Sequence, residues 1–144
     1  MEIKTLLEQR GLLIFDGAMG TQLQAKGLKT GETPELLNLT AKDLLKEIHR
    51  SYIDAGADII SANTFGANSY KLSHSGKSVD EVITAGIINC KEAIKESGKD
   101  VFCALDIGPI GQLLEPTGSL KFEEAYDIFR EELVAGYKAG AGVV

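Results

Sequence analysis

The chain has no tryptophan, only two cysteines and three prolines, and aromatic residues make up just 6% of its 144 residues. Two cysteines cannot form the disulfide framework that stabilises small secreted domains. No stretch approaches the roughly 18 apolar residues that a membrane-spanning helix requires. The amino terminus mixes charges of both signs and lacks the apolar core of a secretory signal. We therefore expect a cytoplasmic protein without a membrane partner.

Basic residues are also few, since 15 lysines and arginines stand against 21 acidic residues and give a formal net charge of −6. Surfaces that bind nucleic acid cluster lysine and arginine, so this balance argues against a nucleic-acid partner. The hydrophobic content of 44% and the charged content of 25% are typical of a globular protein. We expect one domain over residues 1–144.

The most informative segment is 12–21, in which an apolar run ends at Asp16 and a glycine-rich turn. An apolar run bounded by turn signals predicts a strand that is covered on both faces, as in parallel sheets. In parallel α/β folds the chemistry gathers at the carboxyl ends of the strands. We therefore predict a functional mouth at Asp16, beside the backbone amides of Gly17, Ala18 and Gly20.

Strand-like and helix-like patterns alternate along the chain, with strands expected to begin near residues 12, 58, 101 and 142. The first long helix is expected to be capped by Thr40, with Asp43 as a box-like partner, and to stop at Gly56. A shorter amphipathic helix is expected over residues 2–10. The three- and four-residue spacing in the first long helix predicts an inward stripe of Leu44, Leu45, Ile48 and Tyr52.

Two further helices follow the same logic. Ser78 and Glu81 match a capping box for the second, which Gly98 ends, and the third is expected from residue 121 to 138 with Gly140 after it. The residues expected to face inward are Val79, Ile83, Ile87, Cys90 and Ile94 in the second helix and Phe122, Phe129, Leu133 and Tyr137 in the third.

Strand–helix alternation with long crossovers predicts a parallel sheet with right-handed connections. No Gly-x-Gly-x-x-Gly follows the first strand, and all three complete strands end in polar, glycine-rich loops, so a barrel is favoured over a doubly wound sheet. The predicted fold class is α/β: a TIM-type parallel (βα) barrel of which only the first half is here, about three βα units plus the start of strand 4. Because such a barrel needs about 250 residues, we expect exposed strand edges, and either a complementary half-barrel or self-association.

Five segments in order resemble homocysteine S-methyltransferase domains, particularly the amino-terminal, homocysteine-binding modules of cobalamin-dependent methionine synthases. Each motif alone is weak, but five in the correct order over the whole chain are a specific signal. The segments are 13–21 (LIFDGAMGT), 34–38 (PELLN), 49–58 (HRSYIDAGAD), 62–67 (ANTFGA) and 106–111 (DIGPIG).

The resemblance implies a barrel enzyme that transfers a methyl group to the thiolate of homocysteine and produces methionine. Family members hold zinc through three cysteines late in the barrel, two of them in a Gly-Gly-Cys-Cys run, and zinc keeps a bound thiol deprotonated at neutral pH. This sequence has no such run, so the resemblance places the zinc ligands beyond residue 144 and implies that the chain alone is inactive. The methyl donor stays open, because methylcobalamin on another domain serves some members and betaine or S-methylmethionine serves others.

The same resemblance assigns substrate binding to Asp16 and Gly17, with Ala18 adjacent. Asn63 and Asp106 join them as weaker candidates because each follows the end of a later strand. A carboxylate suits the ammonium group of an amino acid, and turn amides suit its carboxylate. The alternative for Asp16, Asn63 and Asp106 is a structural role in anchoring loops. The chain is assigned no catalytic residue and no metal ligand.

The remaining polar and sulfur-containing residues predict no chemistry. Cys90 and Cys103 are expected to be small buried hydrophobes, His49 a partly exposed helix residue and His74 part of a polar loop. The glutamates at 123–124 and 131–132 are expected on a solvated helix face. Besides the methyltransferase, two hypotheses stay open: a non-catalytic half-barrel that binds an amino acid or a partner chain, and a different βα-barrel enzyme with the same layout.

Overall fold

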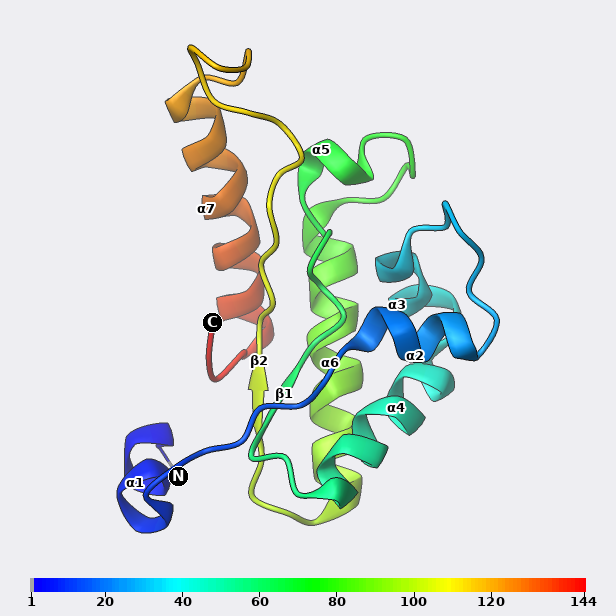
Figure 1. Ribbon diagram of the computed structural model, residues 1–144, viewed down its shortest axis with the longest axis vertical. Helices are drawn as coiled ribbons and strands as arrows, with labels where there is room; N and C mark the ends of the chain where they lie inside the picture. Colours follow the sequence, from blue (N-terminus) through cyan, green and yellow to red (C-terminus); the bar gives the residue numbers. More distant parts are fainter. Residues whose placement is uncertain (1) are drawn as a thin grey trace.

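The structure of the chain is a computed structural model that describes residues 2–144. Two parallel strands, β1 (Ile59–Ser61) and β2 (Phe102–Ala104), pair at its centre. The long helix α6 (Val79–Ser97) lies against them, between α4 (Lys42–Ala55) and α7 (Phe122–Ala139), as Figure 1 shows. This arrangement confirms the predicted α/β class with parallel strands.

Extended segments flank the two strands on both edges. On one edge Phe15 bridges Ile59 in parallel, and on the other Val143 bridges Ala104. The amide of Leu105 donates to the carbonyl of Val143 at 2.8 Å. The four parallel segments therefore follow one another in chain order, as in half of a barrel, whereas a doubly wound sheet reverses its order. The strands predicted near residues 12 and 142 are thus present as single bridges rather than full strands.

The prediction that the first strand is covered on both faces is wrong. Leu12 is 61% exposed and Ile14 is 54% exposed. The backbone of this segment pairs with β1, since the amide of Ile59 donates to the carbonyl of Ile14 at 3.1 Å. The side chains stay bare because no element within residues 2–144 packs over them.

Helix ends follow the predicted chemistry in most places. Ser78 caps α6 by accepting from the amide of Glu81 at 3.1 Å, and Gly98 ends it in the left-handed conformation. Gly56 and Gly140 end α4 and α7 in the same conformation. Such positions favour glycine because it lacks the Cβ atom that strains other residues there.

The predicted cap at Thr40 is wrong. Thr40 is the last residue of the short helix α3 (Leu37–Thr40), which follows a 3-10 turn over Pro34–Leu36. Its hydroxyl donates back to the carbonyl of Leu36 at 3.4 Å, and α4 starts after Ala41 without a side-chain cap. The hydroxyl is used within the preceding turn and so is not available to α4.

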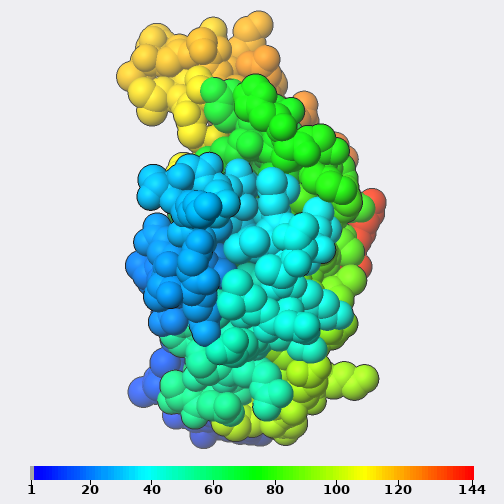
Figure 2. All heavy atoms as spheres, turned by 90° about the vertical axis from the view of Figure 1, so that its right-hand side faces the viewer, coloured from blue at the N-terminus to red at the C-terminus, as the bar shows by residue number. Residues whose placement is uncertain are grey.

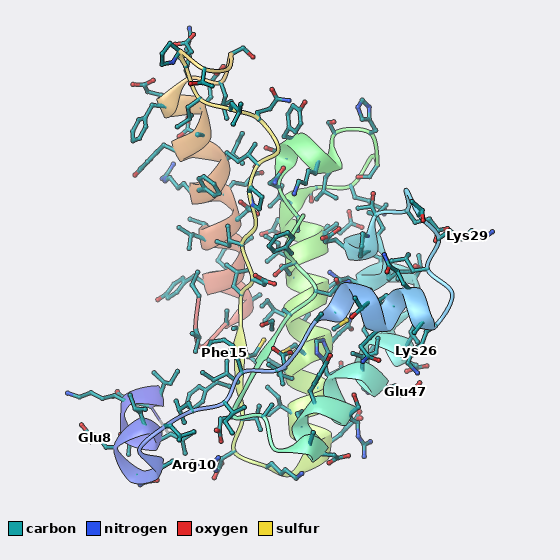
Figure 3. The ribbon with its side chains drawn as sticks, in the orientation of Figure 1. Glu8, Arg10, Phe15, Lys26, Lys29 and Glu47 are labelled. Atoms are coloured by element: carbon teal, nitrogen blue, oxygen red, sulfur yellow. The ribbon has the colours of Figure 1, made fainter. Side chains whose placement is uncertain are left out.

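The main core lies between the strands and the helices behind them. It includes Ile60 and Leu105 from the strand region and the predicted inward residues Ile83, Ile87 and Cys90 of α6. A smaller cluster joins α2 (Met19–Ala25) to α4 through Leu23, Leu45 and Ile48. Figure 2 shows the face where α2 and α4 lie side by side, and Figure 3 shows Lys26 and Glu47 there, whose 2.7 Å ion pair links these helices. The two cysteines are buried and free, as predicted.

The predicted inward stripe of α7 is wrong. Phe122, Leu133 and Tyr137 are exposed and Phe129 is only half-buried, whereas Ala125, Glu132, Ala135 and Gly136 are buried. The small residues let α7 approach the sheet closely, so much so that a Cβ atom at Gly136 would lie 2.5 Å from Leu105 Cδ2. Phe122 and Phe129 instead border a groove of about 330 Å³ along one side of the helix.

Two polar residues lie deeper than expected. Glu132 is fully buried, although Glu123, Glu124 and Glu131 of the same cluster are exposed as predicted. His49 is also fully buried rather than partly exposed, because α4 presents it to the interior together with Leu45 and Ile48. Neither side chain has a hydrogen-bond partner among the described residues.

The amino-terminal helix α1 (Ile3–Arg10) confirms the prediction for residues 2–10 and stands apart from the helical layer in Figure 1. Arg10, labelled in Figure 3, reaches Asp58 and forms an ion pair with it. Asp58 also accepts from the amide of Ile14 at 2.9 Å, so one carboxylate ties α1 and the first extended segment to β1. Within residues 2–144, every helix is too short or too polar to cross a membrane.

Candidate functional site

A cavity of about 400 Å³ opens where the extended segment at 12–15, β1 and β2 reach their carboxyl ends. All five residues predicted to bind substrate lie on its wall. This edge of the sheet is where the barrel prediction places a site. The full lining is Phe15, Asp16, Gly17, Ala18, Met19, Gly20, Pro34, Glu35, Ser61, Ala62, Asn63, Phe65 and Asp106.

Asp16 is held by the last residue of β1. Its Oδ2 accepts from the amide of Ser61 at 2.9 Å and its Oδ1 accepts from the Ser61 hydroxyl at 3.0 Å. A carboxylate has about four lone-pair positions, so two bonds leave acceptor capacity for a ligand. The anchoring role that the sequence left open for Asp16 is therefore present, and it is compatible with a role in binding.

The turn after Asp16 rests on Tyr52 of α4. The Tyr52 hydroxyl donates to the carbonyl of Ala18 at 2.9 Å. A Cβ atom at Gly17 would lie only 2.9 Å from the Tyr52 oxygen, so a larger residue there would displace the tyrosine side chain. The aromatic ring thus fixes the backbone of Gly17 and Ala18 at the cavity wall.

Asn63 lies just after β1 and is buried. Its amide group donates to the carbonyl of Pro34 at 2.8 Å and to Oδ1 of Asn38 at 3.1 Å. Both amide hydrogens are therefore used inside the protein. A contact from Asn63 to a ligand in the cavity would have to use its side-chain oxygen.

Asp106 follows β2 and is placed through its backbone. Its amide donates to the Thr64 hydroxyl at 3.1 Å, and that hydroxyl donates to the Asp106 carbonyl at 2.9 Å. Further along, the amide of Gly108 donates to the carbonyl of Phe65 at 2.9 Å. These bonds join the loops after β1 and β2 and leave the Asp106 carboxyl on the cavity wall.

Three carboxyl groups make the cavity acidic, namely those of Asp16, Asp106 and Glu35. Burial raises the pKa of Asp16 above its ordinary value, and the charge of Asp106 adds to the effect. Burial likewise raises the pKa of Asp106, with Glu35 adding to it. Each carboxylate would be stabilised by a cation, which the cavity wall does not supply.

The described side chains do not supply a set of metal ligands at this cavity. Across the described part of the chain, no three His, Cys, Asp or Glu side chains are grouped so that they could hold a metal. Cys90 and Cys103 are buried in the core and do not line the cavity. The residues present therefore do not fit a zinc site.

The sequence analysis missed three residues of this site. Glu35 is buried and its Oε1 accepts from the amide of Gly66 at 2.7 Å. Ser61 orients Asp16, and Tyr52, expected only as a core residue, supports the turn. The motif at 34–38 drew attention to Glu35 only through the family resemblance, and no local pattern marks Ser61 or Tyr52.

Comparisons with known proteins agree with one another. A model of the family described as homocysteine S-methyltransferase matches residues 13–144. Methionine synthase of Mycobacterium tuberculosis is 29% identical over 154 residues, which cover 99% of this chain and 13% of that protein. Methionine synthase of Mycobacterium leprae is 47% identical over 68 residues, or 43% of this chain and 6% of that protein.

The fold is similar to solved structures of the homocysteine methyltransferase MmuM from Escherichia coli. The oxidized form has a TM-score of 0.83 at 21% identity, and the match covers 96% of this chain and 53% of that one. The metallated form has a TM-score of 0.80 at 22% identity and the match covers 54% of that chain. The chain thus spans about half the length of MmuM and a small part of the methionine synthases.

Proposed function

Because the chain belongs to the homocysteine S-methyltransferase family, we propose that it supplies the amino-acid-binding wall of a homocysteine site. The complete site would accept a methyl group on the homocysteine sulfur and release methionine. The observation that carries this proposal is the single cavity into which Asp16, Asn63 and Asp106 all converge from successive strand ends.

The wall offers complementary groups to both ends of an amino acid. The acidic side chains suit the ammonium group, and Asp16 has free acceptor capacity beside its two bonds to Ser61. The backbone amides of the turn at Gly17 and Ala18 suit the carboxylate of the same molecule. Recognition of the common part of an amino acid leaves its thiol free to point toward residues outside this chain.

The chemistry of methyl transfer belongs to other parts of the enzyme. No residue of this chain is proposed as catalytic, and its described residues hold no metal group. We propose that zinc, which would keep the homocysteine thiol deprotonated, is bound beyond residue 144, and that methylcobalamin on another domain is the donor. We further propose that the exposed strand edges are covered by a complementary half-barrel or by a second copy of the chain, which would complete a TIM-type barrel.

Calorimetric titration of the full-length protein with homocysteine tests this proposal. We expect wild type to bind homocysteine more tightly than its des-amino analogue, because only homocysteine carries the ammonium group. Asp16→Asn should weaken homocysteine binding by about tenfold or more, in line with the loss of one charge-assisted bond, and should leave binding of the analogue unchanged.

Asp100→Asn is the matched control, because Asp100 is exposed and precedes β2 at the end opposite the cavity. Equal binding of homocysteine by wild type and Asp16→Asn would contradict the proposed role of Asp16. Binding without any methyl transfer, in protein loaded with zinc and supplied with each donor in turn, would favour the alternative of a non-catalytic amino-acid-binding half-barrel.

A further inference from the structure

A buried polar network lies directly beneath the cavity wall and centres on Asn38 of α3. Asn38 does not line the cavity and is almost completely buried. Buried amides are costly unless they are hydrogen-bonded. Each polar atom of the Asn38 side chain has a partner, and these partners belong to two different parts of the fold.

The first partner is Asn63 on the cavity wall. Nδ2 of Asn38 donates to the backbone carbonyl of Asn63 at 2.8 Å. In return, Nδ2 of Asn63 donates to Oδ1 of Asn38 at 3.1 Å. This reciprocal pair fixes both the backbone and the side chain of Asn63, so the amide of Asn38 determines where the loop after β1 begins.

The second partner is α6, which provides a rigid reference. The other hydrogen of the Asn38 amide is donated to the carbonyl of Val82 at 3.1 Å. Asn89 donates to the backbone carbonyl of Asn38 at 3.0 Å. Gly86 lies between them on α6, and a Cβ atom there would be 2.8 Å from Asn38 Nδ2 and 3.0 Å from Thr64 Cγ2. The helix is therefore shaped to admit the Asn38 side chain.

We propose that Asn38 is a positioning residue for the cavity, because its amide holds the loop that begins at Asn63 at a fixed place relative to α6. The inference rests on the proposed function, since it concerns the same homocysteine site. Phe65, on the cavity wall, and Gly66 belong to this loop. The amide of Gly66 donates to the carboxylate of Glu35, which also lines the cavity. Displacement of Asn63 would thus move Phe65 and the contact between Gly66 and Glu35 at the cavity wall.

The chemistry requires a donor at this position and not merely a side chain of the right volume. Aspartate has the same shape as asparagine, but it would place an acceptor oxygen against two backbone carbonyls, those of Asn63 and Val82. Leucine fills a similar space and leaves both carbonyls without a donor. The two substitutions therefore remove the same function by different routes.

The first test measures homocysteine binding by Asn38→Asp in the full-length protein, at a temperature at which circular dichroism shows wild type and variant equally folded. We expect the dissociation constant to rise by about tenfold or more. Ser78→Ala is the control, because it removes the cap of α6 and no bond of the network. It should lower the melting temperature and leave the dissociation constant unchanged. An unchanged dissociation constant in a folded Asn38→Asp protein would overturn the proposal.

The second test needs no ligand and so separates this inference from the proposed function. In hydrogen exchange followed by mass spectrometry, Asn38→Asp should lose protection at residues 63–67 and keep the protection of residues 87–94 in α6. Equal loss of protection in both peptides would show that Asn38 stabilises the whole fold and would overturn the positioning role.

If Asn38→Asp does not fold, the milder Asn38→Ser variant is measured in the same way. If wild type does not bind homocysteine, the proposed function fails. The exchange result then decides by itself whether Asn38 positions the loop that begins at Asn63.

Discussion

A carboxyl group removed from water requires a partner or a proton, and the half-buried Asp16 and the fully buried Glu132 meet this requirement differently. Asp16 accepts two hydrogen bonds from Ser61. Glu132 is enclosed on α7, and neither of its oxygens has a hydrogen-bond partner within residues 2–144. Burial raises the pKa of Glu132 to about 7, with Lys71 acting against this shift and Glu131 adding to it. The folded state therefore favours the protonated form of Glu132 more than the unfolded state does.

The raised pKa predicts how stability depends on pH. Between the unfolded pKa of 4.5 and the folded pKa of about 7, the folded state binds the extra proton, so stability falls as pH rises through this window. Glu132→Gln keeps the shape of the protonated side chain and has no charge to bury. We expect it to match wild type near pH 4.5 and to exceed it above pH 7, by at most about 3 kcal/mol. Urea unfolding at both ends of the window measures this difference.

Asp127→Asn is the control for Glu132, because Asp127 is exposed on the same helix and does not contribute to the pKa shift of Glu132. It should change stability by less than about 0.5 kcal/mol at either pH. His49 belongs to both proteins and changes with pH in the opposite sense, since burial lowers its pKa to about 4 and stability is lost as pH falls from 6.5 toward 4. The comparison is therefore made between variants at equal pH. A Glu132→Gln protein no more stable than wild type at pH 8 would show that Glu132 is stably ionised.

At the scale of the elements, periodicity identifies a helix more securely than it identifies the buried face. Both α4 and α6 bury most of the apolar stripes that their spacing predicts, because a large face of each packs on the core. Leu44, Tyr52 and Ile94 of these stripes are only half-buried. In α7 the aromatic residues form the more apolar stripe, yet Ala135 and Gly136 face the sheet. Close approach of two elements selects small residues, and a count of apolar side chains does not show this.

The buried face of α7 can be tested with two adjacent residues. Gly136→Val places a branched side chain where even a Cβ atom would lie 2.5 Å from Leu105 Cδ2, so we expect the free energy of unfolding to fall by about 2 kcal/mol from overpacking. Tyr137→Ser removes a side chain that is 83% exposed, and we expect a change of less than about 0.5 kcal/mol. Chemical denaturation measures both values. The face predicted from the periodicity would require the opposite order.

The candidate site was predictable to the extent that it depends on strand ends. Asp16, Asn63 and Asp106 each follow an apolar run, and parallel strands bring such positions to one edge of a sheet. Glu35 and Tyr52 were not predictable in this way, because each comes from a helical segment and meets the site only through tertiary packing, Glu35 at the cavity wall and Tyr52 behind the turn at Ala18. Their contacts join residues about 30 positions apart, a separation that no local pattern describes.

At the scale of the whole molecule, apolar side chains are bare along the edge where the chain enters the sheet. Leu12, Ile14 and Phe15 are each more than half exposed, and their segment lies beside β1 at the edge of the sheet. A second apolar area borders the groove along one side of α7. Burying a large apolar side chain contributes about 1.5–3 kcal/mol, so a contiguous set of such residues favours association.

The 144-residue chain expressed by itself should therefore associate rather than stay monomeric. Multi-angle light scattering across a concentration series should show a mass above 15.4 kDa that rises with concentration. The double substitution Leu12→Ser and Ile14→Ser should shift the mass toward that of the monomer, because it removes apolar surface and keeps the backbone bonds to β1. Leu113→Ser, at an equally exposed position outside this edge, should leave association unchanged. If the wild-type chain is a monomer at every concentration, the exposed edge does not drive assembly. If both variants dissociate alike, association is nonspecific, and the edge at residues 12–15 is not the surface through which the chains associate.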